Sequence, residues 1–575
     1  LFFLSGMEGR MLIPLGIAFI VALFASTVVA LTLTPVLCSY MLTTKKALKK
    51  NEKEPFVSRT LKVWYKKALE WALRHKKMVI GTSAALLIFT IVIMTGLGRS
   101  FLPPFNEGSL TINISTMPGV SLEESDNMGR MAEEILLDIP EIQTVARKTG
   151  RAELDEHALG VNVSEMEAPF ELDKRSRDEF LADVRQRLGE LKGVNIEIGQ
   201  PISHRIDAML SGTKANIAIK LFGNDLNKLY NIGGQIKEAI QGIEGIADLT
   251  LEQQIERPQL QIKPKRDMLA KYGIPLPEFS EFINVALSGK VVSQVYEGGK
   301  VFDLTVKVHD DDKANMEQIG NLMIDANGQK IPLHYVAEIL PLVGPNTISR
   351  ENVQRKIVVS ANVAGRDLNG VVKDIQKTVG EQITLPEGYH VEYGGQFESE
   401  QAASRTLFLT SVISILLIFL LLFNEFHSMP LSGIIMLNLP LAIIGGVLSI
   451  WFTSGIISIP AIIGFISLFG IATRNGILLV SHYNHLRSEG MSLHDSVIHG
   501  SLDRLNPILM TALTSALALI PLALGGDLPG NEIQSPMAQV ILGGLLSSTL
   551  LNGFVVPIMY LLLNHKQKEI ENLEM

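Results

Sequence analysis

Long apolar runs lie at both ends of the chain and leave a polar middle. Asp, Glu, Lys and Arg are absent from positions 11–44, 78–98, 406–424, 426–473, 505–526 and 533–564. One helical pass needs ~20 apolar residues, because each residue rises ~1.5 Å across the hydrocarbon core. The 426–473 run is long enough for two passes, and Thr453-Ser454-Gly455 followed by Pro460 divides it. The pattern therefore predicts an α-helical polytopic membrane protein with seven transmembrane helices.

Positive charge predicts the orientation of these helices. Residues 43–77 carry twelve Lys and Arg against three Glu, so we expect this segment to be cytoplasmic. From Arg59 to Lys77 apolar residues alternate with cations, a pattern typical of a helix on an anionic membrane surface. A solvated connector is the alternative. Alternation of the spans then places residues 99–405 outside the cytoplasm.

The polar middle has the periodicity of strands and helices in alternation. Two strand–helix–strand units are expected at 110–116, 121–137 and 142–149, and at 168–172, 175–191 and 194–198. A second pair is expected at 217–222, 226–241 and 246–251, and at 356–363, 367–379 and 390–393. Tandem βαβ units predict a large periplasmic α+β insert of ferredoxin-like repeats. Residues 257–355 interrupt the second pair, which predicts a domain inserted into it.

Composition narrows the class of protein. The 575 residues are 47% hydrophobic and 19% charged, and the net charge of −8 argues against a nucleic-acid binder. A single cysteine, Cys38, excludes an internal disulfide. The chain contains no nucleophile elbow, phosphate-binding loop or zinc-protease helix, so an enzyme is not expected. The first residue is Leu1, so we expect the chain to be a fragment of a longer protein.

Several stretches resemble one transporter family. They are 30–37, 101–108, Gly150-Arg151-Ala152-Glu153, Arg205-Ile206-Asp207 and 506–511. Together with seven spans and one large external insert, these stretches resemble the C-terminal half of a resistance–nodulation–division (RND) efflux transporter. The stretches around 101–108, 150–157 and 200–212 are more similar to its heavy-metal branch, the cobalt-zinc-cadmium and copper-silver exporters, than to its multidrug branch.

The resemblance implies a domain organisation in eight segments. They are a first transmembrane helix with its preceding loop (1–42), a basic amphipathic linker (43–77), a second transmembrane helix (78–102), a periplasmic porter subdomain (103–214), a second porter subdomain (215–265 and 354–398), a docking subdomain inserted into it (266–353), five transmembrane helices (403–564) and a cytoplasmic tail (565–575).

The resemblance also implies a function. It implies the inner-membrane subunit of a proton-driven tripartite pump in a Gram-negative bacterium, exporting heavy-metal cations without a cofactor. The implied partners are a periplasmic membrane-fusion adaptor, an outer-membrane channel, two further copies in a homotrimer and the N-terminal half of the same subunit. The family's acidic proton acceptors lie on its fourth span, which this chain does not contain. The alternatives are a multidrug exporter of small organic molecules, disfavoured by 6% aromatic residues, and a non-transporting RND-like module.

Four residues are proposed for proton coupling. Arg474, next to Asn475, lies between apolar residues, and a cation at that depth costs ~2.5–3.5 kcal/mol unless it meets a partner or water. Arg504 and Thr511 are seven residues apart and share one helix face, with Pro507 expected near the helix start. The resemblance makes Arg474 a responder to the acidic pair, and Arg504 and Thr511 relay residues. The alternatives are snorkelling for Arg474, a positive-inside role for Arg504 and a backbone hydrogen bond for Thr511.

Two clusters of potential metal ligands lie in the insert, although neither forms a specific metal motif. They are Glu153, Asp155 and His157 in one, and His204, Asp207 and Met209 in the other. Oxygen and imidazole donors suit Zn²⁺ or Co²⁺, whereas thioethers select Cu⁺. The resemblance places Val163 and Ala208 where copper and silver exporters carry cleft methionines, although Met166 and Met209 lie nearby. We therefore expect Zn²⁺, Co²⁺ or Cd²⁺ as cargo, with hinge and surface charges as the alternative role for these residues.

Overall fold

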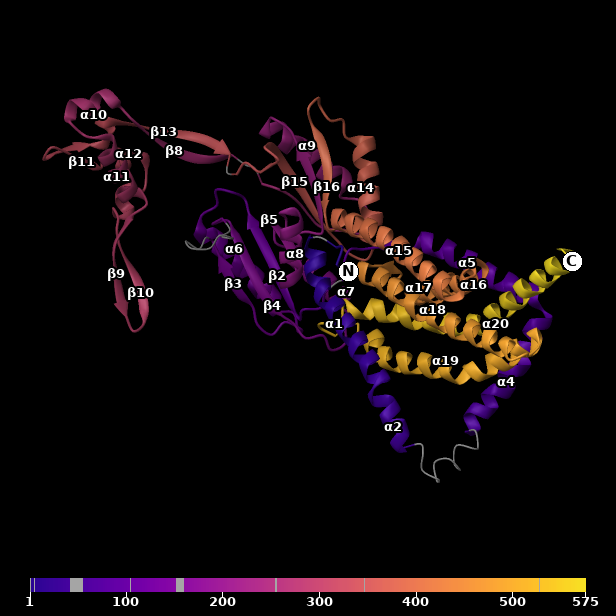
Figure 1. Cartoon of the computed structure of the whole chain (residues 1–575). Helices are drawn as coiled ribbons and strands as arrows, with labels where there is room; N and C mark the ends of the chain where they lie inside the picture. The colour runs from indigo at the N-terminus through magenta and orange to yellow at the C-terminus, as the bar shows by residue number, and fades with distance from the viewer. Residues whose placement is uncertain are drawn as a thin grey trace. The chain divides into compact units, whose positions relative to one another are not determined.

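The computed structural model describes residues 2–4, 6–41, 55–103, 105–150, 160–253, 256–345, 347–526 and 528–574 (Figure 1). Within these residues the chain divides into two compact units. The larger comprises Leu1–Thr116, Leu122–Glu252 and Glu351–Met575, and the smaller comprises Met117–Ser121 and Gln253–Arg350. Each unit is described by itself below.

The larger unit is rich in apolar helices. In its described part, seven helical segments are long and apolar enough to cross a membrane. They are α1 (Gly6–Leu31) with α2 (Leu33–Met41), α5 (Lys76–Gly96), α15 (Gln396–Phe426), α16 (Met429–Met436) with α17 (Asn438–Phe452), α18 (Ile459–Ser488), α19 (Leu493–Leu524) and α20 (Gln534–Glu574). The expected break after position 452 is confirmed, because α17 ends at Phe452 and α18 begins at Ile459.

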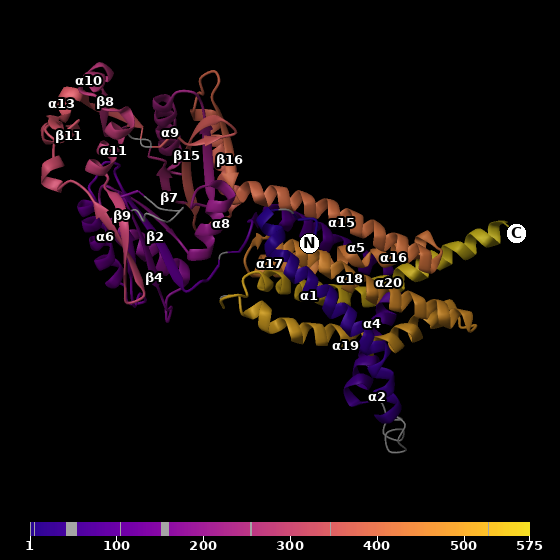
Figure 2. The same cartoon turned by 60° about the vertical axis from the view of Figure 1, so that its left-hand side comes forward.

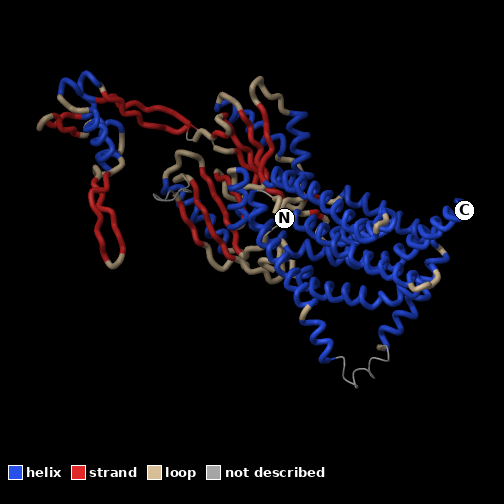
Figure 3. The backbone as a smooth tube through the Cα atoms, in the orientation of Figure 1, coloured by secondary structure: helices blue, strands red, loops and turns tan. Residues whose placement is uncertain are grey.

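Small residues bring α17 and α20 into close contact. A Cβ added to Gly445 would lie 1.9 Å from the carbonyl oxygen of Gly543, so neither position has room for a side chain. The Ser547 hydroxyl accepts a hydrogen bond from the Gly445 backbone N–H at 3.0 Å. This combination is typical of helices that pack in a membrane, where close backbone approach replaces the hydrophobic effect as the source of affinity. Figure 3 shows the long helices of the larger unit, drawn in blue, gathered in a bundle.

The described part of the basic segment begins at residue 55 and contains helix α4 (Phe56–Arg74). The helix ends three residues before Lys77, the end expected from the sequence. One face docks on the membrane helices: Leu69 is fully buried, and the Tyr65 hydroxyl donates to the Gly553 carbonyl oxygen at 2.7 Å. Trp64 points away from this contact and is exposed. The apolar residues of α4 therefore lie on two faces. One face packs against the protein itself, and the other is exposed.

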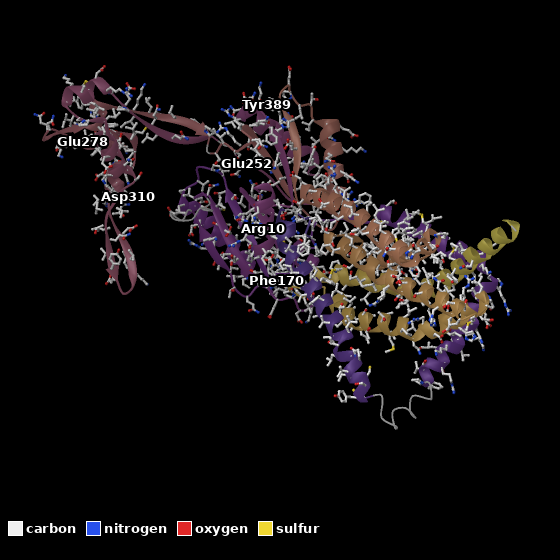
Figure 4. The ribbon with its side chains drawn as sticks, in the orientation of Figure 1. Arg10, Phe170, Glu252, Glu278, Asp310 and Tyr389 are labelled. Carbon is white, nitrogen blue, oxygen red and sulfur yellow. The ribbon has the colours of Figure 1, made fainter. Side chains whose placement is uncertain are left out.

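The first sandwich follows the order βαββαβ. Its elements are β2 (Ser109–Thr116), α6 (Leu122–Leu137), β3 (Ala146–Thr149), β4 (Val163–Pro169), α7 (Arg177–Leu188) and β5 (Val194–Gly199). The strands pair antiparallel in the order β3-β4-β2-β5. Phe170, labelled in Figure 4, belongs to the core between sheet and helices. Its ring packs on that of Phe180, with centroids 4.7 Å apart.

One predicted strand of this sandwich is wrong. The expected strand at 168–172 is β4, which instead runs from Val163 to Pro169. Its buried positions, Ser164, Met166 and Ala168, alternate with glutamates, and only one of the three is a large apolar residue. The larger apolar residues that follow the strand, Phe170 and Leu172, have the stronger hydrophobic alternation, and the predicted strand was therefore placed too far along the chain.

The second sandwich repeats the same order. It contains β6 (Ile217–Phe222), α9 (Leu226–Ile240), β7 (Ile246–Leu251), β15 (Gln354–Val363), α14 (Leu368–Gln382) and β16 (His390–Gly395), with β14 (Arg350–Glu351) at the sheet edge. β15 lies between β7 and β6, and β16 pairs with the other edge of β6. The predicted strands at 217–222 and 246–251 are confirmed to the residue. Figure 2 shows α15 leaving the end of β16 as one long helix.

The smaller unit interrupts the second sandwich between β7 and β15. Its elements are β8 (Glu256–Pro264), α10 (Arg266–Tyr272), α11 (Leu276–Leu287), β9 (Lys290–Glu297), β10 (Lys300–Val306), η1 (Asp310–Lys313), α12 (Met316–Gly320), β11 (Met323–Ala326), β12 (Gln329–Pro332), α13 (Leu333–Val336) and β13 (Ala337–Pro345). This unit has its own hydrophobic core, which includes Leu269, Phe279 and Leu333.

Candidate functional site

A cavity of about 710 Å³ opens between the two sandwiches of the larger unit. Its walls come from α7 and the end of β5, from helix α8 (Pro201–Ser211), from residues 362–368 between β15 and α14, and from residues 100–105 after α5. The lining mixes apolar and polar side chains. Helix α8 contributes two titratable residues to it, His204 and Asp207.

Local chemistry holds α8 in place. Pro201 occupies its first turn, where the missing N–H costs nothing. The Glu107 carboxylate accepts hydrogen bonds from the backbone N–H groups of Ile202 at 2.6 Å and Ser203 at 3.1 Å. A negative charge at a helix N-terminus is favourable, because the unpaired N–H groups there carry partial positive charge. Gly212, at φ 75°, ends the helix in the left-handed conformation that suits glycine.

Asp207 is buried, with 2% of its surface exposed. Gln396 Nε2 donates to its Oδ1 at 2.7 Å, and Asn216 Nδ2 donates to its Oδ2 at 3.1 Å. Burial raises the pKa of Asp207 to about 7, because desolvation of the charged form outweighs these two hydrogen bonds. The carboxyl group is therefore poised to be charged or neutral near physiological pH.

His204 lies one helical turn before Asp207 and is 4% exposed. Burial is the main reason that its pKa is lowered to about 4, with the positive charge of Lys214 adding to the effect. The ring is therefore neutral at pH 7, the form that binds metals. Asn113 Nδ2 is 3.4 Å from Nδ1, at the long limit of a hydrogen bond, and Nε2 has no partner among the described residues. To bind a cation through Nε2, the neutral ring must carry its proton on Nδ1. The Asn113 amide group opposes this tautomer only weakly, because its contact with Nδ1 is so long.

Two of the three arginines in the described lining of the cavity are paired with carboxylates. Arg185 donates through Nε and Nη2 to both oxygens of Asp248 at 3.1 Å. Arg366 forms an ion pair with Asp374 at 2.6 Å. Because Arg185 lies on α7 and Asp248 on β7, this pair joins the first sandwich to the second. Within the second sandwich, Asp248 also accepts a hydrogen bond from Asn362 of β15 at 2.9 Å. The cavity is thus compatible with a cation, because these guanidinium charges have partners of their own.

The structure brings together only part of the predicted metal ligands. His204 and Asp207 share one face of α8, as their spacing requires. Met209 is 66% exposed and does not line the cavity. The other predicted cluster, Glu153, Asp155 and His157, lies outside the described residues. Within the described residues no group of three or more His, Cys, Asp or Glu is arranged to hold a metal.

The methionines near the predicted cleft positions do not face the cavity. Met166 is fully buried in the core of the first sandwich. Val163 starts β4 and Ala208 lies on α8, and neither side chain has an atom that binds a metal. The described lining of the cavity accordingly contains no thioether sulfur.

The four predicted proton-coupling residues lie on α18 and α19 without hydrogen bonds to one another in the described chain. Arg474 is exposed, whereas its neighbour Asn475 is buried with both amide atoms unpartnered. Arg504 is partly buried. The Thr511 hydroxyl donates to the Pro507 carbonyl oxygen at 2.9 Å, and Pro507 lies inside α19 rather than near its start as expected.

Sequence reasoning missed the residues that hold Asp207 and α8. Gln396 and Glu107 are 189 and 95 positions away from the residues they contact. Gln396 stands just before an apolar run and Glu107 in a loop, so neither carries a local signal of this role. Only the fold brings them to α8.

Comparisons with known proteins place this architecture in a transporter family. The chain belongs to the AcrB/AcrD/AcrF family, whose sequence pattern matches residues 1–564. It is 33% identical over 585 aligned residues to the cobalt-zinc-cadmium resistance protein CzcA of Cupriavidus metallidurans, covering 100% of this chain and 55% of that protein. It is 26% identical to the cation efflux system protein CusA of Escherichia coli, covering 98% of this chain and 55% of the relative.

A solved structure agrees with these relatives. The crystal structure of a heavy metal efflux pump superposes with a TM-score of 0.78 at 27% identity, over 89% of this chain and 52% of the pump. The chain thus spans about half the length of the curated relatives it matches.

Proposed function

We propose that this chain is part of the inner-membrane subunit of a proton-driven tripartite efflux pump that exports heavy-metal cations by metal/proton antiport. The observation that carries the proposal is the cavity in which His204 and Asp207 lie buried on one face of α8. A buried carboxylate and a neutral imidazole suit a divalent cation. The metal is the cargo, and the proposal includes no cofactor and no enzymatic step.

The proposed architecture has seven transmembrane spans and two ferredoxin-like sandwiches on the periplasmic side. The matching strand orders β3-β4-β2-β5 and β7-β15-β6-β16 support the repeat. The smaller unit is proposed as the docking subdomain, which the sequence predicts at 266–353 and which overlaps the Gln253–Arg350 segment of this unit. The orientation is tested by cysteine labelling at Lys53 and Asp311: Asp311 labels from outside intact cells, and labelling of Lys53 from outside contradicts the topology.

The proposed assembly is a homotrimer in the inner membrane of a Gram-negative bacterium, with a periplasmic membrane-fusion adaptor and an outer-membrane channel. Support comes from the family and from the names of the relatives, two of which are called efflux or resistance proteins for cations. Each exported cation then leaves the cell through the partners rather than into the periplasm. Crosslinking in cells tests the trimer.

We propose that the cargo is Zn²⁺, Co²⁺ or Cd²⁺ rather than Cu⁺ or Ag⁺. The absence of thioether sulfur from the described cavity lining and the presence of an imidazole and a carboxylate support this preference. The higher identity to the cobalt-zinc-cadmium relative than to the second cation exporter is consistent with it. Weak ligand sets suit a transporter, since cargo must also leave.

Proton coupling is proposed to run through Arg474, with Asn475, Arg504 and Thr511 as its neighbours on α18 and α19. The exposed guanidinium at this depth is tolerable where a carboxylate of another membrane segment faces it. Arginine keeps its proton, so it changes partner when that carboxylate is protonated. Arg474→Ala is therefore expected to abolish metal resistance at normal expression and assembly. Full resistance in this variant identifies Arg474 as a snorkelling residue.

The decisive experiment is growth of a metal-sensitive host that carries the complete transporter, on graded zinc, cobalt, cadmium, copper and silver. We expect protection against the first three, and its loss in Asp207→Ala and His204→Ala. Exposed Met209→Ala is the matched control on the same helix and should protect like wild type. Protection against copper and silver alone contradicts the cargo assignment. Protection against dyes alone moves the chain to the multidrug alternative, and protection against nothing leaves a non-transporting module.

A further inference from the structure

Helix α8 borders the cavity and packs on the membrane helices. Its polar residues His204 and Asp207 face the cavity. Ile206, which also borders the cavity, is buried in a hydrophobic cluster with Leu407 of α15 and Met537 of α20. A helix packed in this way cannot shift without disturbing either the cavity or the helices beneath it, because protein interiors are close-packed.

Polar contacts fasten α8 to the same two membrane helices. Asn106 N–H donates at 3.1 Å to Glu532, which stands two residues before α20, and the adjacent Glu107 binds the N-terminus of α8. In the middle of α8, Asp207 accepts a hydrogen bond from Gln396, the first residue of α15. α8 is thus linked directly to the start of α15 through Asp207, and indirectly to the segment before α20 through Glu107 and its neighbour Asn106.

The contact with Gln396 is the more informative of the two, since it ends on the candidate cation ligand itself. Gln396 is held twice: its side chain donates to Asp207 at 2.7 Å, and its backbone N–H donates to the Asn216 carbonyl oxygen at 3.0 Å. Asn216 also donates to the second oxygen of Asp207 at 3.1 Å. Gly395 precedes Gln396 at φ 92°, and a Cβ there would lie 2.4 Å from the Asn216 carbonyl oxygen. The start of α15 is therefore in close contact with Asn216, the residue before β6 that also donates to Asp207.

We propose that Gln396 is a positioning residue for the cation site, so that the affinity of the cavity for its cargo depends on where the first turn of α15 sits. This inference rests on the proposed function. With α15 seated, two amide groups orient both oxygens of Asp207 toward the cavity. When the start of α15 moves away, Asp207 loses one of them and the site weakens. By reciprocity, a bound cation holds the first turn of α15 in its seat. The periplasmic end of a membrane helix thereby controls binding and release.

Zinc titration of the purified full-length chain tests the proposal, with a competing chromophoric chelator as the readout. Groups that orient a metal ligand typically change affinity by 10- to 100-fold, so Gln396→Met, which keeps the volume without the amide, is expected to weaken Zn²⁺ binding by about that factor. Gln401→Ala, an exposed glutamine on the same helix, is the matched control and should bind like wild type. Asp207→Asn should abolish binding at the site.

Hydrogen–deuterium exchange distinguishes a positioning role of Gln396 from a merely structural role. Zn²⁺ is expected to slow exchange at residues 396–404 in wild type and in Gln401→Ala, and to leave it unchanged in Gln396→Met and Asp207→Asn. Circular dichroism checks that every variant is folded. If Asp207→Asn loses zinc while Gln396→Met binds as tightly as wild type, this inference is overturned and the proposed function stands. If wild type binds no zinc, or Asp207→Asn binds it unchanged, both are overturned.

Discussion

The ion pair between Arg185 and Asp248 is expected to hold the two sandwiches together around the cavity. Asp248 is 7% exposed and Arg185 24%. Two hydrogen bonds of 3.1 Å join them, and Asn362 adds a third contact to Asp248 at 2.9 Å. Asp248 has φ 50°, a backbone conformation that Asn adopts as readily as Asp. Asp248→Asn therefore removes the charge without adding backbone strain.

The loss of stability in Asp248→Asn comes from the Arg185 guanidinium that remains without its carboxylate. In the variant a largely buried guanidinium keeps only a neutral acceptor, and a hydrogen bond to a charged group contributes about 1.5–3 kcal/mol. Because Arg185 is about a quarter exposed, water recovers part of this loss, so we expect a destabilisation of about 2 kcal/mol. The matched control is Asp374→Asn, the same chemical change in the exposed pair with Arg366, which should cost less than about 1 kcal/mol.

The assay is the apparent melting temperature of the purified full-length chain at one fixed scan rate, which keeps irreversible unfolding comparable between variants. Asp248→Asn should lower it by several times as much as Asp374→Asn. The double variant with Arg185→Met should lower it less than the sum of the two single changes, since the partners act together. Equal effects of the two Asp→Asn changes, or additive effects of the cycle, refute the reasoning.

Three further predictions concern α8 and its surroundings. Folding raises the pKa of Asp207 to about 7, so the stability that this carboxyl group contributes is lost as pH rises from about 4 to 7. Folding lowers the pKa of His204 to about 4, so the stability that this ring contributes is lost as pH falls from 6.5 to 4. Asp207→Asn leaves only the histidine term, and the melting temperature should then rise more steeply between pH 4.5 and 7 than in wild type. Gly199→Ala places a Cβ 2.1 Å from the His204 ring, and should weaken Zn²⁺ binding several-fold by calorimetry. Glu107→Gln removes a charge at the N-terminus of α8 and should cost about 1 kcal/mol, measured as a lower melting temperature.

Each of these predictions has its own contradicting result. Parallel pH profiles of wild type and Asp207→Asn mean that the carboxyl group titrates normally in the fold. The control for Gly199→Ala is Gly242→Ala, where the added Cβ meets no atom within 4 Å, and equal zinc affinities of the two variants contradict the contact with His204. An unchanged melting temperature in Glu107→Gln means that the hydrogen bonds to Ile202 and Ser203 survive without the charge.

The elements were predictable where one physical requirement dominated the pattern. Membrane helices are long because the bilayer is thick and contains no water to satisfy the backbone, so uncharged runs mark them reliably. The strands at 217–222 and 246–251 were equally clear, because their apolar residues are concentrated between turn residues. The strand β4 was misplaced, since its inward positions include Ser164 and Ala168 and the larger apolar residues come after it. α4 was expected on a membrane surface, whereas Leu69 and Tyr65 dock one of its faces on the membrane helices.

The candidate site was predictable only in part. His204 and Asp207 are three residues apart, so their shared helix face follows from local geometry. Their environment does not, because Gln396, Asn216 and Glu107 come from segments far along the chain. Met209 is only two residues beyond Asp207, yet its side chain is exposed. Sequence proximity thus identified three potential metal ligands on α8. Only the tertiary structure showed that His204 and Asp207 line the cavity and that Met209 does not.

The amino-acid sequence by itself determined which segments are apolar enough to enter a membrane and which alternate as strands and helices, because periodicity and hydrophobicity act over a few neighbouring residues. It also determined which side chains are able to bind a cation. The tertiary structure decided that α8 borders the cavity and packs on the membrane helices, and that Asp207 is desolvated and held by the first residue of α15. It also decided that Arg185 and Arg366 beside the cavity are paired with carboxylates. These properties depend on contacts between segments up to 426 positions apart, such as Asn106 with Glu532, and only the folded chain brings such groups within the few ångströms over which desolvation and hydrogen bonding act.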